Sequence, residues 1–294
     1  METVGFVGLG KIGLPLAQNL IASGYRVLGF RRGAMDEFEK IGGIPARSPA
    51  DIGAEADMVF SCLPSSAALE EVVQGPKGLV HAARPGQVIV ELGSHPVPVK
   101  ERQIAPLAAK GAVFIDGEVS GTPAMVAARQ AVIYLGGDAE ACRKAERVVK
   151  GFADLCLYFG PFGAASKVKL INNLLVSVHI AAAAEAMALG LRAGVDVDLM
   201  IKAIAPGSGG SSSFAQRAPR MAQRKYDPPM GTANQLTHYF DMIGDLADST
   251  GTATPMLNRA IEIYRQAIAK GYGDRDVSII LEVIEALPRE ASGT

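Results

Sequence analysis

The chain has 294 residues, which exceeds one average domain and makes two domains the first expectation. It is 49% hydrophobic and 20% charged with a formal net charge of -1, so neither a basic surface for nucleic acid nor an acidic tail is expected. The 3 cysteines have no CxxC spacing, which fits neither a disulfide framework nor a zinc site. The first residues already read as a strand, so no targeting segment is expected. We predict a cytoplasmic protein without a bound metal, whose partners are small molecules.

The first half of the chain alternates short apolar runs with helical patterns, from Thr3 to about Phe162. Strand and helix repetition of this kind predicts crossover units, and therefore an α/β fold with a mostly parallel, doubly wound sheet. We predict a Rossmann-type domain over residues 1–162. Its strands are expected at Val4–Val7, Arg26–Phe30, Met58–Cys62, Val88–Glu91, Val113–Ile115 and Ala131–Leu135.

The second half shows no further strand alternation, and its apolar residues recur at helical spacing. The change falls near the turn-rich segment Gly160–Gly163, so we predict an all-α domain over residues 163–294. A helix from about Ala165 to Ala193 would be ~43 Å long and would join the two domains. Helical spacing runs through Lys169–Ala193, Asp198–Ala205, Asn234–Ser249, Pro255–Lys270 and Val277–Leu287.

Two stretches of the second half need separate treatment. Leu174–Leu191 is long and apolar enough for a membrane span, but His179 and Glu185 interrupt it and its flanks show no basic asymmetry, which favours a buried helix of a soluble domain. Pro206–Ser213 is rich in glycine and serine between two helical patterns, so it is predicted to be a mobile loop.

A GxGxxG turn follows the first predicted strand and opens a helix. In such a turn the first glycine permits the tight bend, the second lets the backbone approach a pyrophosphate, and the third lets the helix pack on the sheet. The helix N-terminus then points at the phosphates. An incidental glycine turn is the alternative, but the strand before and the helix after favour a dinucleotide site. Its residues are Gly8, Leu9, Gly10, Lys11, Ile12 and Gly13.

The end of the second predicted strand bears on the choice between NAD and NADP. An acidic residue there would bind the ribose 2′-hydroxyl of NAD, whereas this sequence has Arg31 and Arg32. Guanidinium groups bind a 2′-phosphate in bidentate fashion, so we predict a preference for NADP(H) with NAD(H) still possible. A solvated basic turn is the alternative, and Asp36 or Glu37 could still reach a ribose.

The segment Asp116–Thr122 is expected to follow a strand, at the carboxyl edge of the sheet where ligands bind. The Ser120 hydroxyl beside consecutive backbone N–H groups would form a small concavity that accepts an anion such as a carboxylate. A serine-capped turn explains the same residues equally well.

Lys169 and Asn173 are four positions apart, so on a helix they lie on the same face. A lysine on a largely apolar helix loses hydration, which lowers its pKa toward the range where it exchanges protons near neutrality. Asn173 can donate a hydrogen bond to a substrate oxygen without carrying charge. A surface lysine near a helix start remains the alternative.

Together these segments resemble the β-hydroxyacid dehydrogenase family, which includes 3-hydroxyisobutyrate dehydrogenase and the tartronate semialdehyde, glyoxylate and succinic semialdehyde reductases. The resemblance runs from Val4 to about Leu287. Gly5–Leu20 is similar to the family's first signature, Asp116–Gly121 to its substrate-binding segment and Gly160–Asn173 to its catalytic signature.

The resemblance implies individual roles for several residues. Lys169, rather than Lys167, would be the catalytic lysine, with Asn173 beside it. Ser120 and the adjacent amides of Gly121 and Thr122 would hold the substrate carboxylate. Further cofactor contacts are implied for Leu63, Pro64, Ser65, Ser94 and His238.

Three positions depart from the family pattern. Thr122 stands where a second glycine is usual, Ala165 replaces another glycine, and His238-Tyr239 aligns with a usual Lys-Asp pair. The last departure exchanges a cation near cofactor and substrate for a ring that is neutral at pH 7. In the related 6-phosphogluconate dehydrogenases a histidine precedes the last asparagine of the catalytic signature, so Asn172 and the length of 294 residues argue against that branch.

These residues predict an NADP(H)-dependent oxidoreductase that interconverts a small β-hydroxy acid and its semialdehyde or keto acid, with Lys169 as general acid and base. Two alternatives remain open: a reductase of imines or bulkier uncharged carbonyls, or a non-catalytic NADPH-binding module. The apolar, alanine-rich helical half favours a homodimer or homotetramer.

Overall fold

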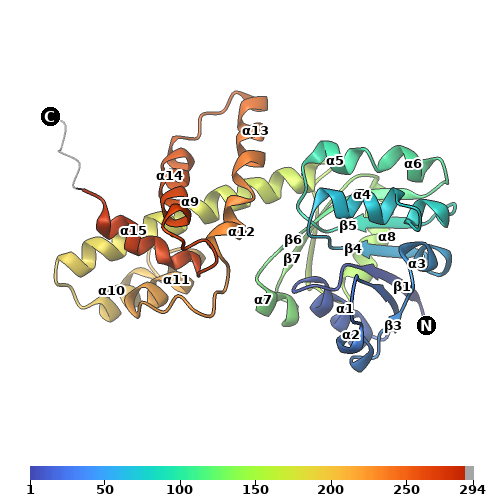
Figure 1. Ribbon diagram of the computed structural model, residues 1–294, viewed down its shortest axis with the longest axis horizontal. Coiled ribbons are helices and arrows are strands. Elements are labelled where there is room, and N and C mark those ends of the chain that lie inside the picture. Colours follow the sequence, from blue (N-terminus) through green and yellow to red (C-terminus); the bar gives the residue numbers. More distant parts are fainter. Residues whose placement is uncertain (289–294) are drawn as a thin grey trace. The chain divides into compact units, whose positions relative to one another are not determined.

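The computed structural model describes residues 1–288 and divides into two compact units, Met1–Lys169 and a second unit that begins at Leu170 (Figure 1). The sequence prediction placed the boundary between residues 162 and 163. The last part of the predicted second domain, residues 289–294, lies outside the described residues.

The first unit is built on an eight-stranded sheet with the order β3-β2-β1-β4-β5-β6-β7-β8. Strands β1 to β6 pair in parallel, β6 and β7 pair antiparallel, and β7 and β8 are again parallel. The order changes direction between β1 and β4, the position where open α/β sheets bind ligands. The bounds are β1 Thr3–Val7, β2 Arg26–Phe30, β3 Ile44–Pro45, β4 Met58–Ser61, β5 Val88–Glu91, β6 Val113–Ser120, β7 Val132–Gly136 and β8 Leu155–Tyr158.

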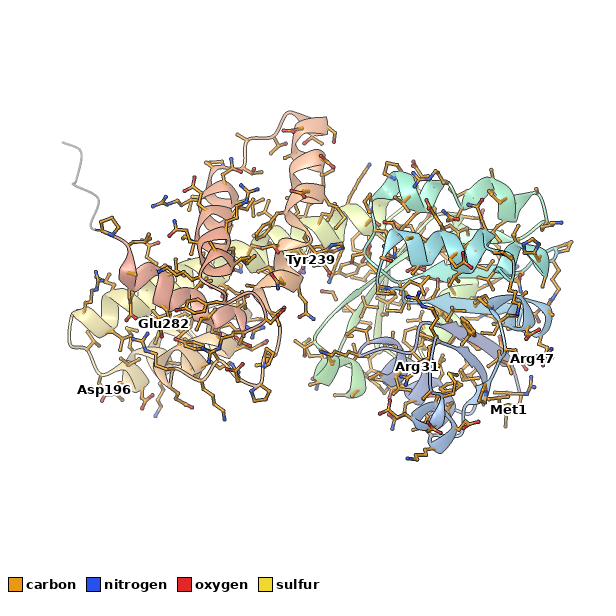
Figure 2. The ribbon with its side chains drawn as sticks, viewed as in Figure 1. Met1, Arg31, Arg47, Asp196, Tyr239 and Glu282 are labelled. Carbon is orange, nitrogen blue, oxygen red and sulfur yellow. The ribbon has the colours of Figure 1, made fainter. Side chains whose placement is uncertain are left out.

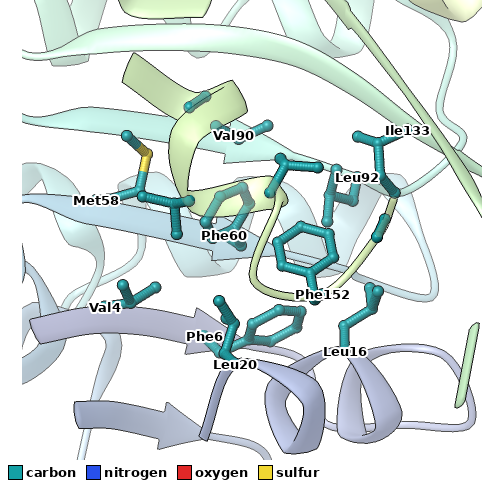
Figure 3. Close-up of a cluster of buried hydrophobic side chains, with 14 of the residues drawn as sticks. Val4, Phe6, Leu16, Leu20, Met58, Phe60, Val90, Leu92, Ile133 and Phe152 are labelled. Carbon is teal, nitrogen blue, oxygen red and sulfur yellow. The ribbon is translucent and has the colours of Figure 1, made fainter. Parts of the chain in front are cut away.

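Helices cover both faces of this sheet, so the predicted Rossmann-type architecture is confirmed. On one face Phe60 packs on Phe6 and, edge to face, on Phe152, with ring centroids 6.3 Å and 5.2 Å apart (Figure 3). The neighbouring Val59 belongs to the cluster on the other face, because successive strand residues point to opposite sides. The helices are α1 Gly13–Ala22, α2 Asp36–Lys40, α3 Pro49–Glu55, α4 Ser66–Gln74, α5 Val97–Glu101, α6 Ile104–Ala108, α7 Pro123–Ala127 and α8 Ala139–Val149.

The second unit is helical, as predicted. Its longest helix, α9 (Ala164–Arg192), starts in the first unit and is long and apolar enough to cross a membrane by length and composition alone. Within the second unit its residues Leu170, Ile180 and Met187 belong to the buried core, which accounts for part of its apolar character. The other helices are α10 Val197–Ile204, α11 Ser212–Ala222, α12 Ala233–Thr237, α13 Phe240–Thr250, α14 Pro255–Ala269 and α15 Ile280–Ala286.

Two strands were not predicted from the sequence. Strand β3 consists of Ile44 and Pro45 alone, which is too short to show a period. Strand β8 is an edge strand whose side chains are mostly exposed, so it has no alternation of buried and exposed positions to detect.

The predicted helix Asn234–Ser249 is wrong as a single element. It is divided at His238-Tyr239, where the Tyr239 N–H donates to Leu236 O, three residues back, instead of continuing the α-helical pattern. Helix α11 was missed, because Pro219 inside it and the preceding glycine and serine run both argue against a helix. Its start at Ser212 also shortens the predicted Pro206–Ser213 loop.

Candidate active site

The glycine turn after β1 has the geometry that a dinucleotide site requires. Gly8 has a φ of +94°, and a Cβ atom there would lie 2.2 Å from Cys62 O. A Cβ atom at Gly13 would lie 1.9 Å from Gly8 O, so the third glycine lets α1 approach the turn. At Gly10 nothing lies within 4 Å of the added atom. Gly10 is therefore the glycine whose open side can accommodate a ligand, whereas Gly8 and Gly13 are packed against protein atoms.

Helix α1 presents an uncapped N-terminus at this turn. Its N-cap residue, Ile12, makes no side-chain capping hydrogen bond, and Gly10 and Lys11 are exposed while Leu9 is buried. Backbone N–H groups at an uncapped helix start favour an anion. The predicted role of this turn in phosphate binding agrees with its geometry.

Arg31 and Arg32 differ in their surroundings. Arg31, labelled in Figure 2, donates from Nε to Ala34 O at 2.6 Å and from Nη1 to Leu9 O at 3.1 Å, and its Nη1 lies 3.6 Å from Glu37 Oε2. It thus joins the glycine turn to the loop after β2. Arg32 is exposed beside it.

The other predicted cofactor contacts of the first unit follow β4 and β5. Leu63 is partly buried, Pro64 is exposed, and the Ser65 hydroxyl accepts from Ala68 N at 3.2 Å, which caps α4. The Ser94 hydroxyl donates to Glu118 Oε2 at 2.5 Å.

The segment Asp116–Ser120 was predicted to follow a strand, and this is wrong because it forms the second half of β6. Pairing with β5 ends at Asp116, but antiparallel pairing with β7 continues to Ser120, which lies opposite Val132. The strand therefore extends beyond β5 at the carboxyl edge. Gly121 follows it, and the Thr122 hydroxyl accepts from Met125 N at 3.3 Å to cap α7.

Lys169 lies on the second turn of α9 and is 8% exposed. Its Nζ donates to Val119 O at 2.7 Å, next to Ser120 in the chain. Burial lowers the pKa of Lys169, and the Glu118 carboxylate opposes part of this shift. The alternative of a surface lysine is therefore wrong, and Lys167, two residues earlier, is the exposed one.

Asn173 lies one turn further along α9, in the second unit, and is 6% exposed. Its Oδ1 accepts from Asn172 Nδ2 at 3.3 Å, while its own Nδ2 is buried without a hydrogen-bond partner in the described part of the chain. A buried donor without a partner is costly, so this amide is a candidate for binding a ligand oxygen. His238, also in the second unit, packs edge to face on Tyr239 with centroids 5.5 Å apart.

A buried polar cluster next to Lys169 was not predicted from the sequence. Lys100 on α5 is fully buried and contacts Asp116 and Glu118 on β6, and Ser166 on α9 contacts the same two carboxylates. Nothing in the charged run around Lys100 distinguishes it from a solvated helix. Within residues 1–288 no three His, Cys, Asp or Glu side chains are grouped so that they could hold a metal ion.

The Rossmann sheet with this glycine turn and the helical second unit belong to an NAD(P)-dependent dehydrogenase that acts on CH–OH groups, as the matches to known dehydrogenases show. Residues 3–160 match the NAD binding domain of 6-phosphogluconate dehydrogenase, and residues 163–284 match the NAD-binding domain of NADP-dependent 3-hydroxyisobutyrate dehydrogenase. The chain belongs to the β-hydroxyacid dehydrogenase family, as the sequence predicted.

Relatives of known activity cover nearly the whole chain. L-threonate dehydrogenase of Cupriavidus necator is 33% identical over 97% of this chain and 97% of its own length. NAD-dependent L-serine dehydrogenase of Pseudomonas aeruginosa is 31% identical over 97% and 98%. The crystal structure of 3-hydroxyisobutyrate dehydrogenase from Salmonella typhimurium has a TM-score of 0.86 and 25% identity, and it covers 96% of this chain and 100% of that one.

Proposed function

We propose that this enzyme prefers NADP(H) and interconverts a small β-hydroxy acid with its semialdehyde or keto acid, with Lys169 as the proton-transferring residue. The observation that carries the proposal is the buried Nζ of Lys169, held by Val119 O at 2.7 Å beside the end of β6. A general acid and base works best when its pKa lies near the operating pH, and burial moves the pKa of Lys169 in that direction.

A nicotinamide cofactor bound at the glycine turn would supply a hydride to the carbonyl carbon in reduction, or take one from the hydroxyl-bearing carbon in oxidation. Lys169 then supplies the proton to the carbonyl oxygen during reduction, or removes it from the hydroxyl during oxidation. The Asn173 amide donates to a substrate oxygen, and its buried Nδ2 without a protein partner supports this role. Ser120 and Gly121, at the end of β6, bind the substrate carboxylate.

The names of the relatives support the choice of substrate class. L-threonate, L-serine, 3-hydroxyisobutyrate and 2-(hydroxymethyl)glutarate all carry a hydroxyl group on the carbon β to a carboxylate. Their remaining substituents differ widely, which suggests that this shared fragment is what the family binds. We therefore propose that the substrate of this chain contains this β-hydroxy carboxylate fragment, without choosing any one of these acids.

The test is a set of initial rates with NADP(H) and NAD(H). The panel contains glyoxylate, the three semialdehydes of succinate, tartronate and methylmalonate, the four hydroxy acids above, and bulky uncharged carbonyls. Lys169→Ala is expected to lower kcat by about 10² to 10⁴-fold, the usual contribution of general acid-base catalysis. Lys167→Ala, on the same helix but exposed, is the matched control and should retain wild-type rates.

Three outcomes would overturn the proposal. Near-normal turnover by Lys169→Ala would remove the lysine from the mechanism. Activity confined to uncharged carbonyls or imines would mean that His238-Tyr239 accompanies a different substrate class. Binding of NADPH without turnover on any of these compounds would instead indicate a non-catalytic module.

A further inference from the structure

Lys100 is an ammonium group with no access to water and with all of its hydrogens used. Its Nζ donates to Asp116 Oδ1 at 2.9 Å, to Gly117 O at 3.0 Å and to Glu118 Oε1 at 3.0 Å. Ser166 Oγ lies slightly further away, at 3.2 Å. An ammonium has three hydrogens, so the three closer acceptors are enough to satisfy it. A lysine this deeply buried and this fully paired is fixed in place.

The two carboxylates are also held by serine hydroxyls. The Ser166 hydroxyl has one hydrogen and lies closer to Asp116 Oδ1, at 2.6 Å, than to Glu118 Oε1, at 3.2 Å. The Ser166 backbone N–H donates to Asp116 Oδ2 at 2.9 Å. The Ser94 hydroxyl donates to the remaining oxygen of Glu118. Each carboxylate oxygen thus has a donor within the cluster.

Among Lys100, Asp116 and Glu118, the charges leave one negative charge in excess. Lys100 contributes one positive charge against the negative charges of Asp116 and Glu118, and all three side chains are buried. Lys169 is the nearby cation that can balance the excess. It lies one turn after Ser166 on α9, and its Nζ binds the carbonyl of the residue that follows Glu118.

We propose that Lys100 and Glu118 are positioning residues, which set the charge around Lys169 so that its side chain can give a proton as an ammonium and accept one as an amine. Glu118 favours the protonated form of Lys169, while Lys100 limits that effect by neutralising one of the two carboxylates. The inference rests on the proposed function of Lys169, which it deepens.

Burial and neighbouring charges act in opposite directions on the pKa values of Lys169 and Glu118. Burial lowers the pKa of Lys169 and Glu118 raises it in part. Burial is the largest influence on the pKa of Glu118 and the net shift is upward, although Lys100, the Ser94 hydroxyl and Lys169 each lower it. A further carboxylate of the first unit, Glu91 at the end of β5, also faces Lys100. It accepts from Gly93 N at 2.7 Å and lies 3.4 Å from His95 Nε2.

The experiment measures the titration of Lys169 directly in the full chain. Lysines are labelled with ¹³C at Cε, and the Lys169 resonance is identified by its loss in Lys169→Arg. Spectra are recorded between about pH 6 and 11, which brackets the ordinary range of lysine and a lowered pKa. No substrate is needed, so the readout does not depend on the identity of the reaction.

The variants should shift the midpoint in opposite directions. Glu118→Gln keeps the shape and an acceptor for Lys100 but removes a negative charge, so the midpoint of Lys169 should fall by about one pH unit or more. Lys100→Met leaves two negative charges unbalanced, so the midpoint should rise. The double variant restores the net charge and should return toward wild type. Glu140→Gln, on the surface of α8 and paired with Arg143, is the control that should change nothing.

A merely structural role would lower the thermal stability of both variants without opposite shifts. If Lys100→Met does not fold, the titration midpoint of Lys169 in Glu118→Gln, compared with that in Glu140→Gln, still tests the inference. A Lys169 midpoint that is the same in wild type and in Glu118→Gln would overturn the inference. The proposed function fails by a different result, namely retained turnover in Lys169→Ala, so the two failures are distinguishable.

Discussion

At the scale of single residues, the two arginines after β2 differ in their contacts, and we expect them to differ in their effect on cofactor binding. Arg31 is bound to backbone oxygens of the glycine turn and of its own loop, whereas Arg32 is exposed and available to a 2′-phosphate. We expect Arg32→Ala to raise the KM for NADPH by about 10 to 100-fold, since a hydrogen bond to a charged group contributes roughly 1.5–3 kcal/mol. The KM for NADH should change little. Steady-state kinetics with both cofactors provides the measurement.

Arg31→Ala should behave differently, because it removes contacts that position the turn itself. Arg31→Ala is expected to weaken the binding of NADPH and of NADH to a similar extent. Arg47→Ala is a suitable control, because Arg47, labelled in Figure 2, is exposed and forms an ion pair with Asp51 on the surface. If Arg32→Ala raised the KM for NADH and the KM for NADPH by the same factor, the Arg32 side chain would not be binding the 2′-phosphate.

The second and third glycines of the turn give another contrast at this scale. Gly13→Ala brings a methyl group against Gly8 O, so we expect a loss of about 1–3 kcal/mol in the free energy of unfolding. Gly10→Ala meets no protein atom and should leave this free energy within about 0.5 kcal/mol of wild type. It should instead raise the Kd for the cofactor by about tenfold or more, because the methyl group occupies the approach of the pyrophosphate.

Chemical denaturation and cofactor fluorescence titration would be run on both glycine variants. If Gly10→Ala were as destabilised as Gly13→Ala, the open side of Gly10 would have to face protein rather than ligand.

At the scale of elements, a buried ion pair joins α11 to the turn before α15. Asp276 accepts from Arg217 Nη1 at 2.7 Å, from Met230 N at 2.8 Å and from Ser278 Oγ at 2.6 Å. Burial raises the pKa of Asp276, but the hydrogen bonds from Ser278 and the charge of Arg217 outweigh it, and the net shift is downward. The folded state therefore favours the ionised carboxylate.

A lowered pKa gives this contribution a definite pH dependence. The stabilisation is fully present above the ordinary value of 3.8 and is lost as the pH falls through the lower folded-state pKa. Asp276→Asn should reduce the free energy of unfolding at neutral pH by about 3–5 kcal/mol, since it leaves Arg217 buried without its partner. The difference from wild type should narrow in acid, as followed by urea unfolding across this pH range.

The exposed Asp241→Asn provides the control for a general effect of charge. If the difference in the free energy of unfolding between wild type and Asp276→Asn stayed constant as the pH fell, Asp276 would not be ionised in the folded state.

Elements that carry a local pattern were predictable from the sequence. The glycine turn has a recognisable motif, and strands β1, β2, β4 and β5 are short apolar runs that can be detected in the sequence. Lys169 stands out because it is a cation on an apolar helix. Strand β6 was predicted too short, because its second half is stabilised by antiparallel pairing with β7 rather than by a hydrophobic run. Lys100 could not be found, since its partners Asp116 and Glu118 come together with it only when α5 packs on β6.

At the scale of the whole molecule, each unit has its own hydrophobic core, yet the second unit still exposes apolar side chains. Ile171, Leu175 and Leu189 share one stripe of α9, because their spacing corresponds to whole turns of 3.6 residues. Leu189 is 71% exposed, and Met256 on α14 is 70% exposed. Large apolar side chains exposed on one surface are typical of an interface. We therefore predict a homodimer or homotetramer.

Light scattering coupled to gel filtration tests this prediction. The wild-type chain should have a mass of two or four times 30.7 kDa. Leu189→Glu places a carboxylate in the stripe and should shift the mass toward the monomer with little change in thermal stability, since the side chain is not part of the core. Lys202→Glu introduces the same charge on the exposed side of α10 and should keep the wild-type mass. A wild-type chain that is monomeric at micromolar concentration would contradict the prediction, and the stripe of α9 would then be a tolerated exposed surface.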